Sequence, residues 1–463
     1  MKCLKASFQK NAHKIALVDT IDGSCATYND ILSCRTKIIK YFGKNKNNLI
    51  FYQPQNTLIS AKFILALLST DNTLCLVPPK IGNDILNDYI DNFSPDFIFS
   101  NKENTPSAGS YTHCEHEIIP NTELYIPKTS SPLPIDKNIR LLLTTSGSTG
   151  SSKFVQLTEE NISSNVSSVE RSMMITDRDI PYCHLPFHYS YGLSVLISHA
   201  RAGAKLVVTS STLMEKPFWK DIDRYQCTFF PAVPFHIETI LKFGLERLRI
   251  PSVRKFSVAG GALDKEKQAT FLKQLTRDSD FFVMYGQTEA SPRITSFNLK
   301  HYPEKIGSVG KPLNNTEILI TPTEHEIILT GPSVMRGYAA DRKSLSPDQE
   351  PITKLSTGDL GYIDKDEFLY ITGRKKRIAK IYGHRISLED IEQKLSLCSP
   401  CILLEGNNLL HAFYHEDDKE DELDKLFKNN YNFPGKQIQF HLISEFPRQE
   451  SGKVDFQKLH KLL

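Results

Sequence analysis

Residues 145–153 combine hydroxyl side chains, glycines and a lysine in a pattern that could hold phosphate. The segment follows the apolar run 141–143 and includes Thr145, Ser146, Gly147, Ser148, Thr149, Gly150 and Lys153. Glycines let the backbone approach a ligand closely, successive backbone N–H groups form an anion nest, and lysine adds a positive charge. The pattern predicts a loop that wraps a polyphosphate, with a flexible Ser/Gly linker as the alternative.

The same segment does not match the Walker motif. That motif requires G-x-x-x-x-G-K-[ST], whereas Gly147 and Gly150 lie closer together and Phe154 follows Lys153. An ordinary P-loop kinase or GTPase is therefore disfavoured.

Helical and strand patterns alternate on both sides of this segment. Apolar residues recur at helical spacing over residues 28–42, and Thr158 is a candidate cap for a helix over 157–166. A further helix is predicted over 235–243, and strands over 49–52, 74–77, 97–100, 205–209, 227–230, 255–259 and 281–285. The alternation predicts an α/β fold with a mainly parallel sheet.

From residue 306 onward, short β segments separated by turn residues predict a small β subdomain. These segments cover 317–320, 326–329, 361–363 and 368–371. A basic stretch at 374–380 precedes a final α+β segment with a helix predicted over 388–397. Because 463 residues exceed one hydrophobic core, two or three domains are expected.

The composition is ordinary for a globular chain: 40% of the residues are hydrophobic and 24% are charged. The net charge of +3 gives no argument for a nucleic-acid or anionic-membrane partner, and no apolar run approaches the roughly 20 residues of a membrane span. The polar residues after Lys2 do not resemble a signal peptide. Nine scattered cysteines, of which only Cys398 and Cys401 are close, predict reduced thiols in a cytoplasmic protein.

Six motifs occur in one order along the chain. They are Thr145–Lys153, Tyr285–Glu289, Gly307–Pro312, Ser356–Gly361, Gly373-Arg374 with Gly383–Ile386, and Ser451–Lys453. Together they resemble the AMP-forming adenylating enzymes, which include acyl- and aryl-CoA synthetases, peptide-synthetase adenylation domains and firefly luciferase. The resemblance covers about residues 10–463. It implies a large N-terminal α/β domain with a small β subdomain over 1–375, a hinge, and a small mobile α+β domain over 376–463.

The resemblance also implies a reaction in two steps. A carboxylate first attacks the α-phosphate of ATP, which gives acyl-AMP and pyrophosphate. A thiol, either that of CoA or that of a carrier-protein phosphopantetheine, then takes the acyl group.

In this reaction the hydroxyl-rich segment with Lys153 would hold the β- and γ-phosphates. Tyr285 would stack on adenine, and Gly260, Gly261 and Ala262 would line the base, with Gly286 and Gln287 in the same ATP site. Thr288 would bind the α-phosphate, and Glu289 would hold Mg²⁺, which prefers oxygen ligands. Asp359 would accept both ribose hydroxyls, and Arg374 would meet ribose or phosphate. The alternatives are that Tyr285 packs in the core, that Glu289 lies on the surface and that Asp359 serves only in a turn.

The resemblance makes Lys453 the catalytic lysine, because a fixed cation stabilises the charge that builds at phosphorus. Without its neighbours, a lysine so near a C-terminus would be read as solvated. Lys376 falls at the hinge position. Lys380 and Gly383 fall where the C-terminal domain faces the active site during thioester formation.

Several positions depart from the family pattern. Ser152 and Phe154 replace the usual Pro and Gly around Lys153, so the exit of the loop is expected to differ. Glu159 stands where a histidine is common. Tyr189 occupies the usual histidine position, with His188 one place early, which leaves the gate between the acid and thiol sites open to question.

The acid is predicted to lack an α-amino group. Enzymes of this family that select α-amino acids usually carry an aspartate after a phenylalanine, but residues 187–190 read Phe-His-Tyr-Ser. A buried ammonium without a counter-charge would be costly. The candidate pocket residues are His188, Tyr189, Ser190, Phe235, His236 and Gly286. Phe235 and His236 could instead form a core pair.

CoA and a carrier protein remain equal candidates for the acceptor. An amino-acid-activating enzyme and a non-catalytic nucleotide- or carrier-binding relative are the alternative functions. Joint retention of Glu289, Asp359, Arg374 and Lys453 argues against the non-catalytic relative. Nothing in the chain specifically indicates a luciferase-like oxygenase.

Overall fold

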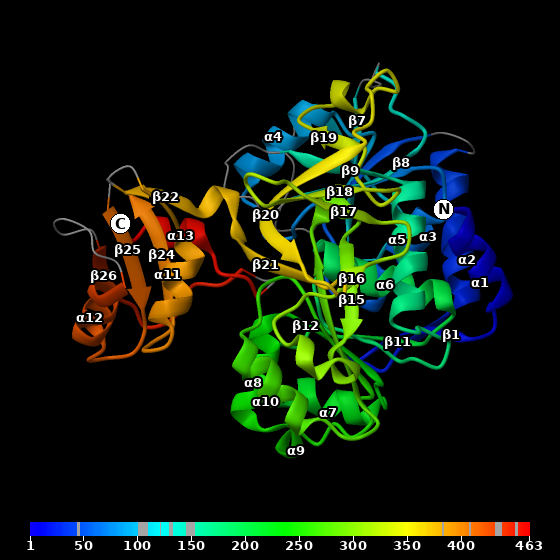
Figure 1. The fold of residues 1–463 in the computed structure, drawn as a ribbon. Helices are drawn as coiled ribbons and strands as arrows, with labels where there is room; N and C mark the ends of the chain where they lie inside the picture. Colours follow the sequence, from blue (N-terminus) through cyan, green and yellow to red (C-terminus); the bar gives the residue numbers. More distant parts are fainter. Residues whose placement is uncertain are drawn as a thin grey trace. The chain divides into compact units, whose positions relative to one another are not determined.

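The computed structural model describes residues 1–43, 47–100, 110–120, 122–128, 133–144, 153–381, 384–406, 409–430, 438–449 and 452–463. Backbone packing divides the chain into two compact units (Figure 1). Unit 1 comprises Met1–Glu317 and Leu329–Leu355, and unit 2 comprises Ile318–Ile328 and Ser356–Leu463. The boundary predicted between residues 375 and 376 stays a prediction.

An eight-stranded sheet forms the first core of unit 1, in the order β19-β9-β8-β4-β3-β5-β7-β6. Its strands are β3 (Leu49–Tyr52), β4 (Thr73–Leu76), β5 (Phe97–Ser100), β6 (Tyr111–Cys114), β7 (Glu123–Pro127), β8 (Ile139–Thr144), β9 (Phe154–Thr158) and β19 (Gly337–Ala339). The central strands β5, β3, β4 and β8 are parallel. Helix α4 (Asn83–Phe93) buries Phe93 in the same core cluster as Phe51 and Phe154.

Helix α3 (Leu58–Leu68) is buried at nine of its 11 residues, which explains its almost uninterrupted apolar sequence. Thr57 caps it by accepting a hydrogen bond from the backbone N–H of Ser60. Within the described ranges, no helix is long and apolar enough to cross a membrane.

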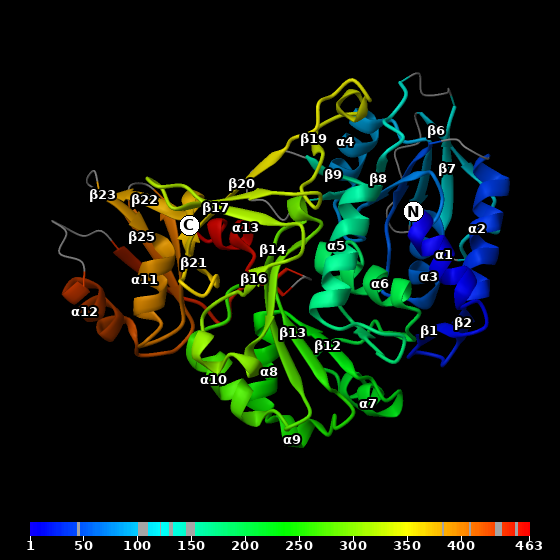
Figure 2. The ribbon, with the colours of Figure 1, turned by 45° about the vertical axis from the view of Figure 1, so that its right-hand side comes forward.

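A five-stranded sheet in the order β12-β13-β14-β15-β16 forms the second core of unit 1. Its strands are β12 (Phe229–Ala232), β13 (Lys255–Val258), β14 (Asp280–Gly286), β15 (Arg293–Asn298) and β16 (Lys311–Pro312). The first three are parallel, and β15 returns antiparallel to β14. Figure 2 shows α8 (Pro234–Phe243) and α10 (Lys265–Gln274) beside β12 and β13. This confirms the predicted α/β class.

A third sheet, β10-β11-β1-β2, and the remaining helices complete unit 1. These elements are α1 (Lys2–Lys10), β1 (Ile15–Asp19), β2 (Cys25–Thr27), α2 (Tyr28–Phe42), α5 (Glu159–Ser172), β10 (Tyr182–Cys183), α6 (Ser190–Ala202), β11 (Leu206–Val208), α7 (Lys216–Arg224) and α9 (Leu245–Leu248). Helix α2 has the predicted bounds. The helix predicted from residue 157 begins instead at Glu159, because β9 pairs with β8 up to Thr158. Thr158 caps α5, as predicted.

Unit 2 contains most of a four-stranded sheet, a hairpin and a three-stranded sheet with its own core. The strands are β17 (Glu317–Ile320), β18 (Glu326–Thr330), β20 (Lys354–Ile363), β21 (Leu369–Arg374), β22 (Ile378–Ile381), β23 (His384–Ser387), β24 (Cys401–Gly406), β25 (Leu409–Tyr414) and β26 (Ile438–Leu442). The helices are α11 (Leu388–Leu395), α12 (Glu420–Asn430) and α13 (Phe456–His460). Ile391 and Leu395 of α11 pack with Leu403 and Ala412 of the three-stranded sheet.

We expect His184 to make unfolding easier as the pH falls from about 6.5 to about 4. Its ring stacks on Phe230 at 4.9 Å, its Nδ1–H donates to the Tyr182 carbonyl, and burial lowers the pKa of His184 to about 4. The unfolded chain binds a proton over this interval and the folded imidazole does not, which corresponds to about 3 kcal/mol of unfolding free energy.

Urea unfolding at several pH values checks this effect. A His184→Phe variant should lose less stability between pH 6.5 and 4 than the unchanged protein, whereas a variant of the exposed His13, His13→Gln, should not differ. Equal pH dependence with and without His184 would contradict the expectation.

Candidate nucleotide and acid site

Three segments of the predicted site leave one edge of the five-stranded sheet. The parallel register pairs Ala232 with Val258 and Val258 with Val283. The strands therefore run to the same edge of the sheet, where residues 233–236 and 259–262 follow β12 and β13, and β14 continues along β15 to Gly286. Ligands of open α/β sheets bind at such carboxyl ends.

The backbone at Gly260 is shaped by the neighbouring Tyr189. Gly260 has φ +83°, and a Cβ there would lie 2.3 Å from the Tyr189 hydroxyl oxygen. Only glycine combines this φ with so close an approach. A candidate acid-pocket residue and the predicted adenine-lining segment are thus in contact. Gly261 and Ala262 follow at the exposed end of β13.

A hydrogen bond joins the predicted phosphate motif to the predicted acid pocket. The Thr288 hydroxyl donates to the Ser190 hydroxyl at 3.1 Å. Ser190 is the first residue of α6 and is buried, and Tyr189 and His188 precede it. A carboxylate that attacks the α-phosphate requires this proximity.

The turn that carries Gly286, Gln287 and Glu289 is held from two sides. A Cβ at Gly286 would lie 2.0 Å from the Pro292 carbonyl oxygen, so a larger residue would displace the return strand. The Gln287 N–H donates to the same oxygen at 2.8 Å. The Tyr338 hydroxyl donates to Glu289 Oε1 at 2.8 Å. Burial, followed by the Glu289 carboxylate, raises the pKa of Tyr338, so its hydroxyl stays a donor.

Phe235 and His236 lie in the first turn of α8. His236 Nδ1 accepts a hydrogen bond from the Val233 N–H at 3.0 Å, and its ring meets the edge of His184 at 4.9 Å. Both residues are half-buried, and their pocket role stays a prediction. Tyr285, also half-buried, is the next-to-last residue of β14 and lies opposite Thr295.

In unit 2, the Ser356–Asp359 turn is organised around a buried carboxylate. Glu326 accepts hydrogen bonds from the Ser356 hydroxyl, from the Gly358 N–H at 3.2 Å and from Lys375 Nζ at 3.1 Å. The Ser356 hydrogen bond is the main cause that lowers the pKa of Glu326 and keeps it ionised.

This turn presents Asp359 next to the strand that carries Arg374. The two residues pair across β20 and β21, and Arg374 Nε lies 2.8 Å from Asp359 Oδ1. The carboxylate is 4% exposed, whereas the guanidinium is 63% exposed. The sequence predicts that both residues bind the nucleotide. In the structure they form an ion pair with each other.

The two predicted lysines, Lys453 and Lys153, differ in exposure. Lys453 is half-buried, and its carbonyl accepts from the Gln449 N–H at 2.8 Å. Lys153 is exposed where the chain enters β9. The segment 145–152, which includes Thr145, Ser146, Gly147, Ser148, Thr149 and Gly150, lies outside the described residues, as do Gly383 and the side chains of Lys376 and Lys380. The ends of that segment, Thr144 and Phe154, pair across β8 and β9.

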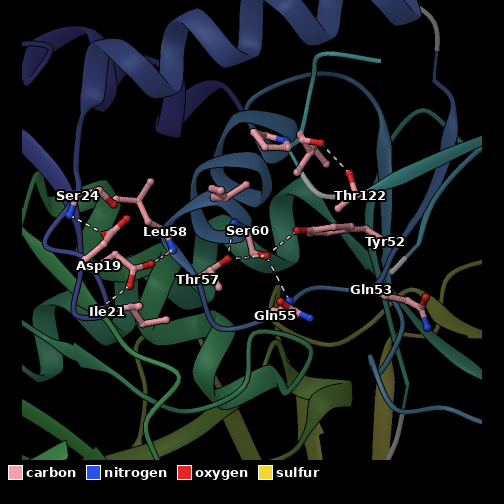
Figure 3. A pocket seen from close by; sticks show the side chains of 14 residues that line it. Asp19, Ile21, Ser24, Tyr52, Gln53, Gln55, Thr57, Leu58, Ser60 and Thr122 are labelled. Atoms are coloured by element: carbon pink, nitrogen blue, oxygen red, sulfur yellow. Dashed lines mark hydrogen bonds between the residues drawn. The ribbon is translucent and has the colours of Figure 1, made fainter. Parts of the chain in front are cut away.

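A separate pocket of about 190 Å³ lies beside α3 (Figure 3). Tyr52 and Thr57 direct their hydroxyls to Ser60, and Asp19 accepts from the Leu58 N–H at 3.0 Å. These polar groups bond one another, and none is a predicted site residue.

Sequence reasoning did not identify Tyr338, Glu326 or Arg293. Arg293 is 3% exposed and opens β15, whose six residues are all buried. A charge at the start of an otherwise uncharged strand was the available signal. Tyr338 and Glu326 carried none, because their partners lie 49 and 30 residues away.

The chain matches the AMP-binding enzyme family over residues 5–339. A 2-succinylbenzoate–CoA ligase of Bacillus subtilis is 30% identical over 338 residues, which are 68% of this chain and 67% of that protein. A 4-coumarate–CoA ligase of Pinus taeda is 28% identical over 67% of this chain and 63% of its own length, less than two thirds.

Solved structures agree with the fold. The o-succinylbenzoate CoA synthetase of Bacillus subtilis, in complex with its acyl-adenylate intermediate, has a TM-score of 0.76 and 23% identity, and the alignment covers 99% of this chain and 97% of that chain. The chain belongs to the AMP-binding enzyme family. Its mixed α/β architecture, with a large N-terminal and a smaller C-terminal part, is that of the family's solved members.

Replacing Asp359 by asparagine should raise the KM for ATP about 10- to 100-fold, because a charge-assisted hydrogen bond contributes about 1.5–3 kcal/mol. Asparagine keeps the size of the side chain but loses the charge that suits two hydroxyl donors. Steady-state kinetics with varied ATP measure the effect. The matched control is Asp366→Asn, in the exposed turn before β21. An unchanged KM for ATP in Asp359→Asn would reject the nucleotide role.

Proposed function

We propose that this protein is an AMP-forming acid–thiol ligase. It activates a carboxylic acid with ATP and Mg²⁺ to acyl-AMP, and then transfers the acyl group to the thiol of CoA. The observation that carries the proposal is the Thr288–Ser190 hydrogen bond, because it joins the predicted phosphate motif to the predicted acid pocket. Family membership supports the same conclusion.

In the first step, the chain positions the α-phosphate next to the acid. Tyr285 and the backbone of residues 260–262 hold adenine, and the segment 145–150 with Lys153 holds the outer phosphates. Thr288 donates to the α-phosphate. Lys453 stabilises the charge that develops at phosphorus during attack. Asp359 and Arg374 bind the ribose.

The residues present fit a magnesium ion that arrives with the nucleotide. No cluster of three acidic, histidine or cysteine side chains occurs within the described part of the chain. Glu289 offers one carboxylate, and Mg²⁺ is commonly bound by one or two carboxylates together with phosphate oxygens and water. When bound, the ion would neutralise phosphate charge. Tyr338 orients the Glu289 carboxylate through its hydrogen bond.

For the second step we propose CoA as acceptor, because the relatives described above are named CoA ligases. Residues 376–463 would act as a mobile domain hinged at Lys376, with Lys380 and Gly383 facing the thiol. A carrier-protein phosphopantetheine presents the same chemical group and is tested alongside.

The acid lacks an α-amino group in this proposal. No carboxylate occurs in residues 187–190, and the buried cation Arg293 lies nearby on β15 and would repel an ammonium. The acids that name the two relatives, 4-coumarate and 2-succinylbenzoate, also have no amino group. We further propose a cytoplasmic location, supported by nine cysteines that are all free.

Pyrophosphate release tests the adenylation step. With ATP, Mg²⁺ and a panel of aliphatic, aromatic and amino acids, we expect acid-dependent release that falls about 100- to 1,000-fold in Lys453→Ala, the range known for lost transition-state donors. The exposed Lys461, eight positions away, supplies the control Lys461→Ala, which should retain full activity.

Adding CoA, or a carrier protein with a free phosphopantetheine thiol, to the same assay and measuring thioester formation identifies the acceptor. If pyrophosphate release were fastest with α-amino acids, the proposal that the acid lacks an α-amino group would be contradicted. Absence of release with every acid, while ATP still binds, would reject catalysis in favour of a nucleotide-binding relative.

A further inference from the structure

Arg293 is a buried cation in unit 1. It is 3% exposed at the start of β15. Its Nη1–H donates to the Ser194 hydroxyl on α6, and its Cζ lies 4.8 Å from the centre of the Tyr191 ring. Its backbone bonds the side chain of Asn165 on α5. Two helices, α5 and α6, therefore contact it.

These contacts do not provide a hydrogen-bond acceptor for every N–H donor of the guanidinium. Its Nε is buried and has no hydrogen-bond partner among the described residues. No carboxylate there forms an ion pair with Arg293, whose neighbours are the Ser194 hydroxyl and the side chains of Tyr191 and Tyr189. A guanidinium carries five N–H donors and remains charged. Burying such a charge without an anion is costly, and a cation–π contact offsets only part of the cost.

The position of Arg293 connects it to the proposed acid site. It pairs with Gly286 across β14 and β15, next to the turn that carries Thr288. Its partner Tyr191 lies directly after Ser190, which accepts the Thr288 hydrogen bond. On the same turn, the Gln287 Nε2 is also buried without a partner among the described residues. Two unused donors thus adjoin the place where the acid would lie.

We propose that the acid substrate is a dicarboxylic acid and that Arg293 binds the carboxylate that does not react. This inference rests on the proposed function and names its substrate class. The reacting carboxylate faces Thr288 and the α-phosphate, and the second carboxylate supplies the anion that the protein does not provide. Arg293 is then a specificity-determining residue, because it discriminates between a charged and a neutral distal end.

The structural alternative is that Arg293 only ties α6 to β15 through Ser194 and Tyr191. The two roles differ in one measurable respect. If Arg293 only links α6 to β15, its replacement would reduce activity with all acids equally. If Arg293 binds the second carboxylate, its replacement would reduce activity only with acids that carry one. A third possibility, contact with the reacting carboxylate, would also affect all acids equally.

The test compares dicarboxylic acids of three to eight carbons, and terephthalate, with their monomethyl esters. The ester keeps the length and removes the second charge. In acid-dependent pyrophosphate release, we expect kcat/KM for the preferred diacid to exceed that of its ester by about 100-fold. This comparison uses the unchanged protein, so it does not depend on the folding of any variant. Equal use of diacid and ester would overturn the proposal.

Two variants refine the test. Arg293→Met keeps the bulk of the side chain and should reduce the diacid preference to within about threefold, with little loss for the ester. Arg293→Lys should retain part of the preference. Arg171→Met, at an exposed arginine of α5, is the control. An equal loss for diacid and ester in Arg293→Met would indicate the structural tie or the reacting carboxylate, and would overturn the proposal.

Thermal unfolding separates failure of this inference from failure of the proposed function. If no acid releases pyrophosphate, the proposed function is rejected, and the inference is decided by binding. A diacid that raises the unfolding temperature more than its ester, in the unchanged protein but not in Arg293→Met, would still support the site. No difference between diacid and ester would reject the inference.

Discussion

Parallel pairing of β12, β13 and β14 is the constraint on which the candidate site of unit 1 depends. Because the three strands run in one direction in register, the segments after Ala232, Val258 and Gly286 meet at one edge of the sheet. The N-terminus of α6 reaches the same edge, where Ser190 accepts a hydrogen bond from Thr288. A reaction between a carboxylate and an α-phosphate needs this convergence, since positioning supplies much of the rate enhancement.

Unit 2 depends on a different interaction, the hydrogen bonds of the buried Glu326. Its carboxylate binds Ser356 and Gly358 in one turn and Lys375 after β21. These donors compensate the burial of the charge. The turn then presents Asp359 to Arg374. The Glu326 carboxylate thus holds the turn before Asp359, the predicted ribose ligand. It also holds Lys375, which precedes the predicted hinge residue Lys376.

Some polar side chains of the candidate site in unit 1 have hydrogen-bond partners, and others do not. Glu289 has a hydrogen-bond donor in Tyr338, and Thr288 has an acceptor in Ser190. By contrast, Arg293 and Gln287 retain buried donors without partners among the described residues. Unsatisfied polar groups cost stability and concentrate at functional sites. By contrast, in the pocket beside α3 the Tyr52 hydroxyl bonds Ser60 and the Asp19 carboxylate accepts from the Leu58 N–H (Figure 3).

The sequence by itself determined the family, most local elements and the candidate residues of the site, because periodicity, caps and motifs are local signals. Helix α2 over Tyr28–Phe42 and the cap at Thr158 follow from such signals. Only the tertiary structure decided that β9 is a strand, that Arg293 is buried beside α6 and that Glu326 holds the turn before Asp359. Each of these depends on partners distant in the chain, whose proximity arises only when the sheets pack.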